Sequence, residues 1–314
     1  MKPALRHVHV GLYGAVMGLA GLGLTSRAAA PVWPGVLRAP AYFTEPWVLA
    51  GLLVLGILIV LYAIKLAQAP RSVREDFVNP LTLGFCGAFP VGMSLAAGGI
   101  GPYFPLAGRA LWWLSFALLI AFQVWGLTRL LSGGIELAQV NAGWLILFVG
   151  GIVVPGPAIG LGLGAPARFA FGISATIAPI LMAILFYRVI AGPPLPDALR
   201  PTWFILLVPP SLIYANGIAL YPELGFLETL YFFALALGAA LLVVSRRFWR
   251  WPFGPPWWAF TFPLDALAYA ATRYAQDHPA PLARAACAVA LLLATAFVAL
   301  VLVRTLRSAA SRRA

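Results

Sequence analysis

Residues 202–220 read TWFILLVPPSLIYANGIAL, an apolar run with two prolines, Pro209 and Pro210, near its middle. About 17–25 apolar residues are enough for a helix to cross the hydrocarbon core of a bilayer. A proline inside such a helix removes a backbone donor and frees a carbonyl, which finds no water in lipid. The run therefore predicts a membrane-spanning helix that is kinked and shielded from lipid by its neighbours.

Segments of this kind recur along the whole chain. Apolar runs of spanning length predict one polytopic membrane domain over residues 1–314, with ten transmembrane helices. The expected spans are 8–25, 46–66, 80–98, 109–131, 140–158, 167–190, 202–220, 226–244, 257–274 and 282–304. Interior prolines fall in the odd-numbered spans at Pro90, Pro155, Pro157, Pro209, Pro210 and Pro263, and in the even-numbered ones only at Pro179.

The spacing of these prolines, about one helical hairpin apart, predicts how the helices are arranged. Kinked helices are tolerated where neighbours or a water-filled cavity satisfy the backbone, so we expect the odd-numbered helices inside and the even-numbered ones outside. Five hairpins of the same direction predict pseudo-fivefold symmetry about the membrane normal and a central pore. The alternative is a solid bundle in which the prolines only bend packed helices.

Composition and charge support a membrane protein. With 62% hydrophobic and 10% charged residues, a soluble globular domain is excluded. The net charge of +12 does not indicate a nucleic-acid partner, because the basic residues flank the apolar runs. Fifteen of the 21 Lys and Arg side chains, including Lys2, Arg6, Arg188, Arg312 and Arg313, fall on the side of the termini. Both termini are therefore predicted to be cytoplasmic, with the lipid bilayer as the surrounding partner.

The first apolar run also has features of a secretory signal, since Ala28, Ala29 and Ala30 follow it. Pro31 would stand directly after the cleavage position, which disfavours cleavage. We therefore expect this segment to be retained as the first span.

The predicted interior offers little for catalysis. Away from the span ends, the odd-numbered spans hold one acidic or basic side chain, Asp265, and the two cysteines, Cys86 and Cys287, lie alone in apolar stretches. General acid–base, nucleophilic and metal catalysis each need several groups close together. The sequence predicts neither an enzyme nor a metal site, and it implies no cofactor.

A pore without fixed charges would select solutes by diameter, backbone dipoles and the surrounding potential. Basic residues on the cytoplasmic side raise the local concentration of anions, so small inorganic or carboxylate anions are the expected passengers. The alternative is that these basic residues serve only to orient the chain. Asp265 has two interpretations, because a carboxyl inside a span is costly and by default functional. It is either a proton- or ion-coupling group of a carrier, or a structural carboxyl held by a hydrogen bond or an arginine.

Four motifs resemble the tellurite-resistance/dicarboxylate transporter family, which includes bacterial TehA and the plant guard-cell slow anion channels. They are Gly14-Ala-Val-Met-Gly18-Leu-Ala-Gly21-Leu, Gly84-Phe-Cys-Gly-Ala-Phe-Pro90-Val-Gly92-Met, Arg200-Pro-Thr-Trp-Phe-Ile-Leu-Leu-Val-Pro209-Pro210-Ser and Trp257-Trp-Ala-Phe-Thr-Phe262-Pro263-Leu. Together they cover most of the chain in the family's order, and the last two are the most specific.

The resemblance implies an anion channel or channel-like transporter, a homotrimer in which each protomer has its own pore, in the bacterial cytoplasmic (inner) membrane. It also implies that Phe262 gates the pore. The pore-lining residues carried over are Gly14, Gly18, Pro90, Pro210 and Pro263. The alternative is a proton-coupled carrier or exporter of dicarboxylate, sulfite or tellurite-type oxyanions that uses Asp265. A membrane anchoring protein without transport is a third hypothesis.

Two residues depart from the family's pattern. Val16 stands where the family commonly has a proline, so the first helix is expected to be straighter. Asp265 stands where a small or apolar residue is usual, which leaves the choice between channel and coupled carrier open. The sequence does not choose the anion.

Overall fold

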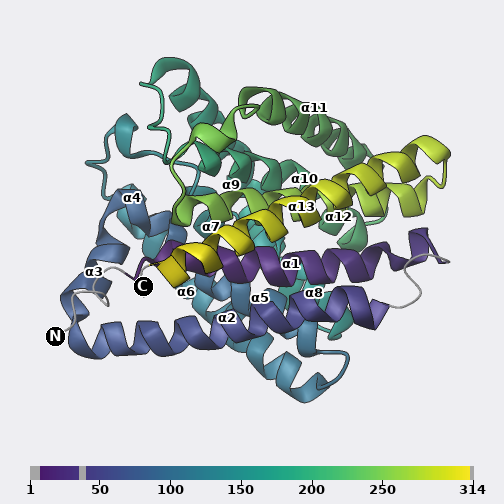
Figure 1. Cartoon of the computed structure of the whole chain (residues 1–314), viewed down its shortest axis with the longest axis horizontal. Helices are drawn as coiled ribbons and strands as arrows, with labels where there is room; N and C mark the ends of the chain where they lie inside the picture. The colour runs from purple at the N-terminus through teal and green to yellow at the C-terminus, as the bar shows by residue number, and fades with distance from the viewer. Residues whose placement is uncertain (1–7, 35–39, 312–314) are drawn as a thin grey trace.

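The structure is a computed structural model that describes residues 8–34 and 40–311, and it is built almost entirely of helices (Figure 1). Within these ranges, eight helical stretches are long and apolar enough to cross a membrane. They are Val10–Val32, Phe43–Gln68, Pro80–Ile100, Pro105–Leu131, Gly164–Ala191, Arg200–Leu220, Gly225–Val244 and Pro281–Ser311. Each overlaps one predicted span. The basic residues at the two ends, Lys2, Arg6, Arg312 and Arg313, lie outside the described residues.

Five long helices form the outside of the bundle, and each corresponds to an even-numbered span. They are α2 (Pro40–Gln68), α6 (Pro105–Leu131), α9 (Gly164–Ala191), α11 (Glu228–Val244) and α13 (Pro281–Ser311). Only 22% to 33% of the residues in their apolar windows are buried. A helix that is apolar on its exposed face suits contact with lipid rather than with water.

The odd-numbered spans lie inside. The α-helices α1 (Gly14–Ala29), α5 (Ala88–Ile100) and α10 (Val208–Leu220) belong to stretches whose apolar windows are 72% to 78% buried. Each follows a 3-10 segment, namely Val10–Tyr13, Gly84–Gly87 and Arg200–Leu207, and α12 (Thr261–Asp277) follows the 3-10 segment Pro255–Phe260. The inner spans therefore change helix type partway along their length.

The prolines stand at this change of helix type. Pro90, Pro210 and Pro263 are each the third residue of their α-helix, and Pro155 is the first residue of α8 (Pro155–Gly160). In the first turn of an α-helix the N–H groups have no intrahelical partner, so a proline costs little there. The expected mid-helix kink is instead a junction between a 3-10 segment and an α-helix.

Two predicted spans differ from single apolar helices. Span 140–158 is divided into α7 (Trp144–Phe148), a 3-10 turn at Gly150–Ile152 and α8. The glycine pair Gly150 and Gly151, followed by an isoleucine, two valines and a proline, explains this break. Span 257–274 corresponds mainly to α12, which carries the charged residues Asp265, Arg273 and Asp277. Because α12 is largely buried by protein, it has little need of an apolar surface.

The inner segments contact one another in a closed ring. Contacts run from α1 to α5, from α5 to α8, from α8 to α10, from α10 to α12 and from α12 back to α1. Each also packs against the helix that follows it, as α1 does against α2 and α12 against α13. In Figure 1 the beginning of α1 and the last turns of α13 lie at the same end of the bundle.

Gly18 permits the closest approach between α1 and α12. A Cβ atom at position 18 would lie 2.5 Å from Thr261 Cβ and closer still to its Oγ1. We expect Gly18→Ala to lower the free energy of unfolding by about 1–3 kcal/mol, as overpacking of a filled interior does. Thermal unfolding of the purified protein in detergent checks this. Adding Thr261→Gly removes the clashing atoms and is expected to recover part of the loss, whereas additive losses would contradict the assignment.

Candidate functional site

Two cavities lie inside the ring of inner segments. The first has a volume of about 700 Å³ and lies where the inner segments begin. The second has a volume of about 470 Å³ and lies towards their ends. Both have predominantly apolar walls.

All five inner segments contribute to both walls. The first cavity is lined by Gly14 and Met17 of α1, by Ala88 and Val91 of α5, and by Ile205 and Val208 around the start of α10. The divided segment contributes Leu145, Ile146, Val149, Gly150 and Val153, and the start of α12 contributes Trp258, Ala259, Phe262 and Pro263. The second is lined by residues further along the same segments, namely Gly21 and Thr25, Leu95 and Gly98, Gly156 and Pro157, Leu212 and Asn216, and Asp265 and Tyr269. The segments therefore run in parallel from one cavity to the other.

Phe262 lies between the two cavities, and its side chain lines both of them. Val153 is the other residue that borders both. The Phe262 ring packs against α1 at Gly21, where an added Cβ would lie 3.0 Å from Phe262 Cδ2. Phe262 borders both cavities and is only 6% exposed, so it is packed tightly by its neighbours. Gly21, Val153 and Asn216 were not among the predicted site residues.

The other predicted pore-lining residues have different surroundings. Gly14 and Pro263 line the first cavity. Gly18 faces Thr261, and the Pro90 carbonyl accepts a hydrogen bond of 2.7 Å from Ser115 Oγ on α6. Neither of these residues nor Pro210 lines the two cavities, and both prolines are buried among the packed segments.

Asp265 lies in the wall of the second cavity and is fully buried. Neither of its carboxylate oxygens has a hydrogen-bond partner among the described residues. Asn216 lines the same cavity: its Nδ2 donates to the Ile152 carbonyl at 2.7 Å, while its Oδ1 is unpartnered. The second cavity therefore has two buried side chains that can each accept a hydrogen bond.

The outer rim of the second cavity carries Arg27, which is paired. Its Nη2 lies 2.9 Å from the carboxylate of Glu45 on α2, and the guanidinium also donates to the carbonyls of Gly98 and Gly99 on α5 at 3.3 Å. These contacts tie the end of α1 to α2 and α5. The charge of Arg27 is thereby compensated.

The first cavity has a different polar rim. Its ionisable lining residues, within the part of the chain that the structure describes, are His9 and Arg188, and no carboxylate lines it. The His9 Nδ1 accepts a hydrogen bond of 2.9 Å from the Gly11 backbone N–H and so begins the first 3-10 turn. Arg188 was predicted only as one of the basic residues on the cytoplasmic side. Its place in the cavity wall depends on the path of the loop after α9, which has no local signature in the sequence.

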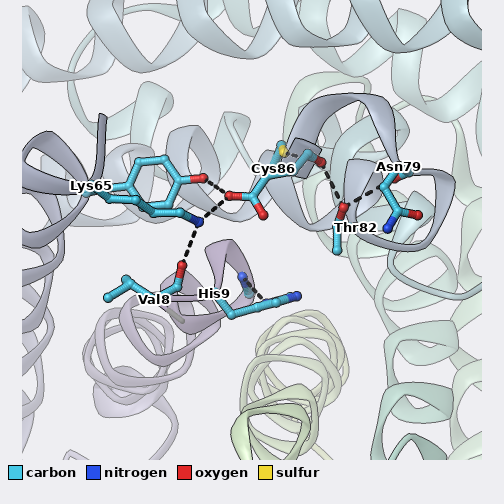
Figure 2. A network of polar contacts seen from close by, with 9 residues as sticks. Val8, His9, Lys65, Asn79, Thr82 and Cys86 are labelled. Carbon is cyan, nitrogen blue, oxygen red and sulfur yellow. Dashed lines mark hydrogen bonds and ion pairs between the residues drawn. The ribbon is translucent and has the colours of Figure 1, made fainter. Parts of the chain in front are cut away.

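A buried polar network lies beside this rim, as Figure 2 shows. Lys65, in the last turn of α2, donates 2.7 Å to Asp76 Oδ2 on α3 (Pro70–Val78) and 2.9 Å to the Val8 carbonyl. Tyr62 also donates to Asp76 Oδ2. Thr82 Oγ1 donates to the Asp76 carbonyl at 2.9 Å and itself lines the first cavity. The network thus connects α2, α3 and the Val8 backbone with Thr82 in the wall of the first cavity.

The part of the chain that the structure describes contains no group of three or more His, Cys, Asp or Glu residues that could hold a metal ion. Cys86 and Cys287 are both buried and unpaired.

Comparison with known proteins shows which family has this architecture. A family model described as SLAC1, voltage-dependent anion channel, matches residues 7–306. The S-type anion channel SLAH3 of Arabidopsis thaliana is 25% identical over 97% of this chain and 49% of its own length. The guard cell S-type anion channel SLAC1 of the same plant is 26% identical over 97% of this chain and 56% of its own length.

The chain spans about half the length of these two plant channels. An archaeal relative, the uncharacterized transporter MJ0762 of Methanocaldococcus jannaschii, is 25% identical over 84% of both chains. The family and these relatives are channels or transporters rather than enzymes. Since the family model covers almost all of a chain that is helical, apolar and multi-spanning, the chain belongs to the SLAC1 family of voltage-dependent anion channels.

Proposed function

We propose that this protein is an anion channel or channel-like transporter in which each protomer carries one central pore that Phe262 closes. The observation that carries the proposal is the position of Phe262 between two cavities that all five inner segments line. Small anions would enter the first cavity, pass the ring when it moves aside, and leave through the second cavity. Membership of an anion-channel family supports the same cargo class.

We infer that all ten predicted spans cross the membrane as five hairpins with pseudo-fivefold symmetry. The closed order of contacts among α1, α5, α8, α10 and α12 supports this inference. The divided segment and α12 fall outside the eight long apolar helices. Both are surrounded by protein, where a broken or polar helix is tolerated.

We also propose an oligomeric state and an orientation in the membrane. A homotrimer with one pore in each protomer follows from the family resemblance. A bacterial inner membrane with both termini cytoplasmic follows from that resemblance and from the distribution of Lys and Arg. The first cavity would then open to the cytoplasm.

The alternative function is a proton-coupled carrier or exporter of dicarboxylate, sulfite or tellurite-type oxyanions. It is favoured by the unpartnered carboxyl of Asp265 in the wall of the second cavity. A carboxyl in such a place can take up and release a proton during each transport cycle.

Flux measurements on vesicles containing the purified protein test both functions. If the protein is a channel, nitrate should leave loaded vesicles down its own gradient at a rate that an imposed pH gradient does not change. Asp265→Asn should then keep at least about half of this flux, because asparagine preserves the shape of the side chain. Asp277→Asn, which alters an ion-paired residue on the same helix, is the matched control.

Two outcomes would reject the channel. A flux that requires a pH gradient and disappears in Asp265→Asn, but not in Asp277→Asn, would establish the carrier instead. Vesicles whose nitrate leaks no faster than from protein-free vesicles would reject a nitrate-conducting channel.

A further inference from the structure

Arg188 is a buried cation without an acidic partner. It lies in the last turn of α9 and is only 3% exposed. The ion pairs among the described residues involve other side chains, so no carboxylate lies within ion-pair distance of its guanidinium. Taking an arginine out of water without compensating its charge is strongly unfavourable. Among the described residues, no protein carboxylate balances this charge.

The guanidinium is held in a fixed position by the loop that follows α9. Its Nη1 donates a hydrogen bond of 2.7 Å to the Pro193 carbonyl. Gly192 provides the necessary space, since a Cβ there would lie 3.0 Å from Arg188 Cδ and closer still to Nη1. Its Nε is buried and has no hydrogen-bond partner among the described residues. One donor is thus satisfied by the fold, and Nε is left without a protein partner among the described residues.

The surroundings of Arg188 determine which ligand fits. Arg188 lines the first cavity, whose described wall has no carboxylate and is mostly apolar. It also borders a third cavity of about 220 Å³ beside Arg200, but Arg200 is compensated by Asp197 at 3.0 Å. A fixed, uncompensated guanidinium in an apolar chamber favours a small anion, because charge-assisted hydrogen bonds strengthen when water is excluded.

We propose that Arg188 forms an anion-binding site in the wall of the first cavity, where it holds a small monovalent anion before that anion reaches Phe262. Suitable monovalent anions are halides and planar oxyanions such as nitrate. A planar oxyanion can lie along one edge of the guanidinium group. This proposal rests on the proposed function for its place in transport, whereas binding itself does not depend on transport. A single weak site near the entrance raises the local anion concentration without trapping the ion.

Binding is tested on the purified full-length protein in detergent. Nitrate replaces gluconate at constant ionic strength, and the midpoint of thermal unfolding is followed, because a ligand of the native state raises it in a saturable way. Arg188→Gln keeps a polar amide at this position but removes the charge. We expect the half-saturating nitrate concentration to rise about tenfold or more, as the loss of a charged hydrogen-bond partner implies.

Arg129 provides the matched control. It lies in the last turn of α6, donates Nη1 to the Gly133 carbonyl at 3.4 Å, and lines neither cavity. Arg129→Ala should therefore bind nitrate like the wild type. An Arg188→Gln protein with the wild-type nitrate response would overturn the proposal.

If Arg188→Gln fails to fold, the site can still be tested on the wild-type protein. Crystals of the wild-type protein grown in sodium bromide should give an anomalous peak beside Arg188 Nε. Bromide ordered elsewhere in the first cavity, with none at Arg188, would reject the site.

The same variants in vesicles separate failure of the site from failure of the proposed function. One outcome is that the nitrate concentration that half-saturates the flux is equal in the wild type and Arg188→Gln, and that nitrate raises the midpoint of unfolding equally in both. This outcome would reject the site and leave the channel proposal in place. The opposite outcome is that the wild-type protein carries no nitrate but is stabilised by it, and that Arg188→Gln is not stabilised. This would reject the channel and support the site.

Discussion

Replacing Phe262 by alanine is expected to raise anion flux through the reconstituted protein at least about tenfold. The residue borders both cavities, of about 700 and 470 Å³, so its removal is expected to join them. Moving a buried phenylalanine out of contact costs about 1.5–3 kcal/mol. Each 1.4 kcal/mol of barrier corresponds to about a tenfold change in rate, which sets the size of the effect. Nitrate efflux from vesicles, or conductance in planar bilayers, measures it directly.

Control variants distinguish a gate from a general loosening of the bundle. Leu264 lies two residues further along α12, is 2% exposed and lines neither cavity. Leu264→Ala should lower thermal stability without raising the flux, and Phe262→Leu should give an intermediate flux. A folded Phe262→Ala protein with wild-type flux would mean that the ring does not limit passage.

The inner and outer positions of the helices could be predicted from the sequence, because proline placement and hydropathy are local properties. Pro90, Pro210 and Pro263 mark three of the buried segments. The form of the irregularity could not be predicted in the same way. A proline at mid-span is compatible either with a kink in one helix or with the start of a new α-helix after a 3-10 segment, and only the folded backbone distinguishes them.

Contacts between side chains from segments far apart in the sequence were harder to predict from the sequence. Phe262 was identified through a motif, whereas Gly21, which the ring contacts, is one of many glycines in the chain. Asn216 and Arg188 reach the cavities because of tertiary packing. The partnership of Lys65 and Asp76 depends on the turn between α2 and α3, and the two residues were not singled out in the sequence.

Replacing Asp76 by alanine is expected to destabilise the protein by about 3–5 kcal/mol, the typical cost of leaving one member of a buried ion pair uncompensated. Lys65 is 2% exposed, and its Nζ lies 2.7 Å from Asp76 Oδ2. Without Asp76 the ammonium keeps only the Val8 carbonyl as a hydrogen-bond partner among the described residues. Unfolding of the purified protein by increasing mole fractions of sodium dodecyl sulfate measures the difference.

An exposed ion pair gives the matched comparison. Arg200 and Asp197 lie 3.0 Å apart, with side chains 42% and 55% exposed, so Asp197→Ala should cost less than about 1 kcal/mol. Equal losses in the two variants would contradict a special role for the buried pair.

The buried pair itself need not be a net source of stability, and a double variant separates the two possibilities. Neutralising both members, as in Lys65→Met with Asp76→Asn, removes the uncompensated charge and is expected to recover more than half of the loss seen in Asp76→Ala. What the pair then contributes is position, because it fixes the Val8 carbonyl and the α2–α3 turn beside His9 and Thr82, which line the first cavity. The stable double variant should therefore carry anions with an altered half-saturating concentration. Unchanged transport would limit the role of the pair to stability.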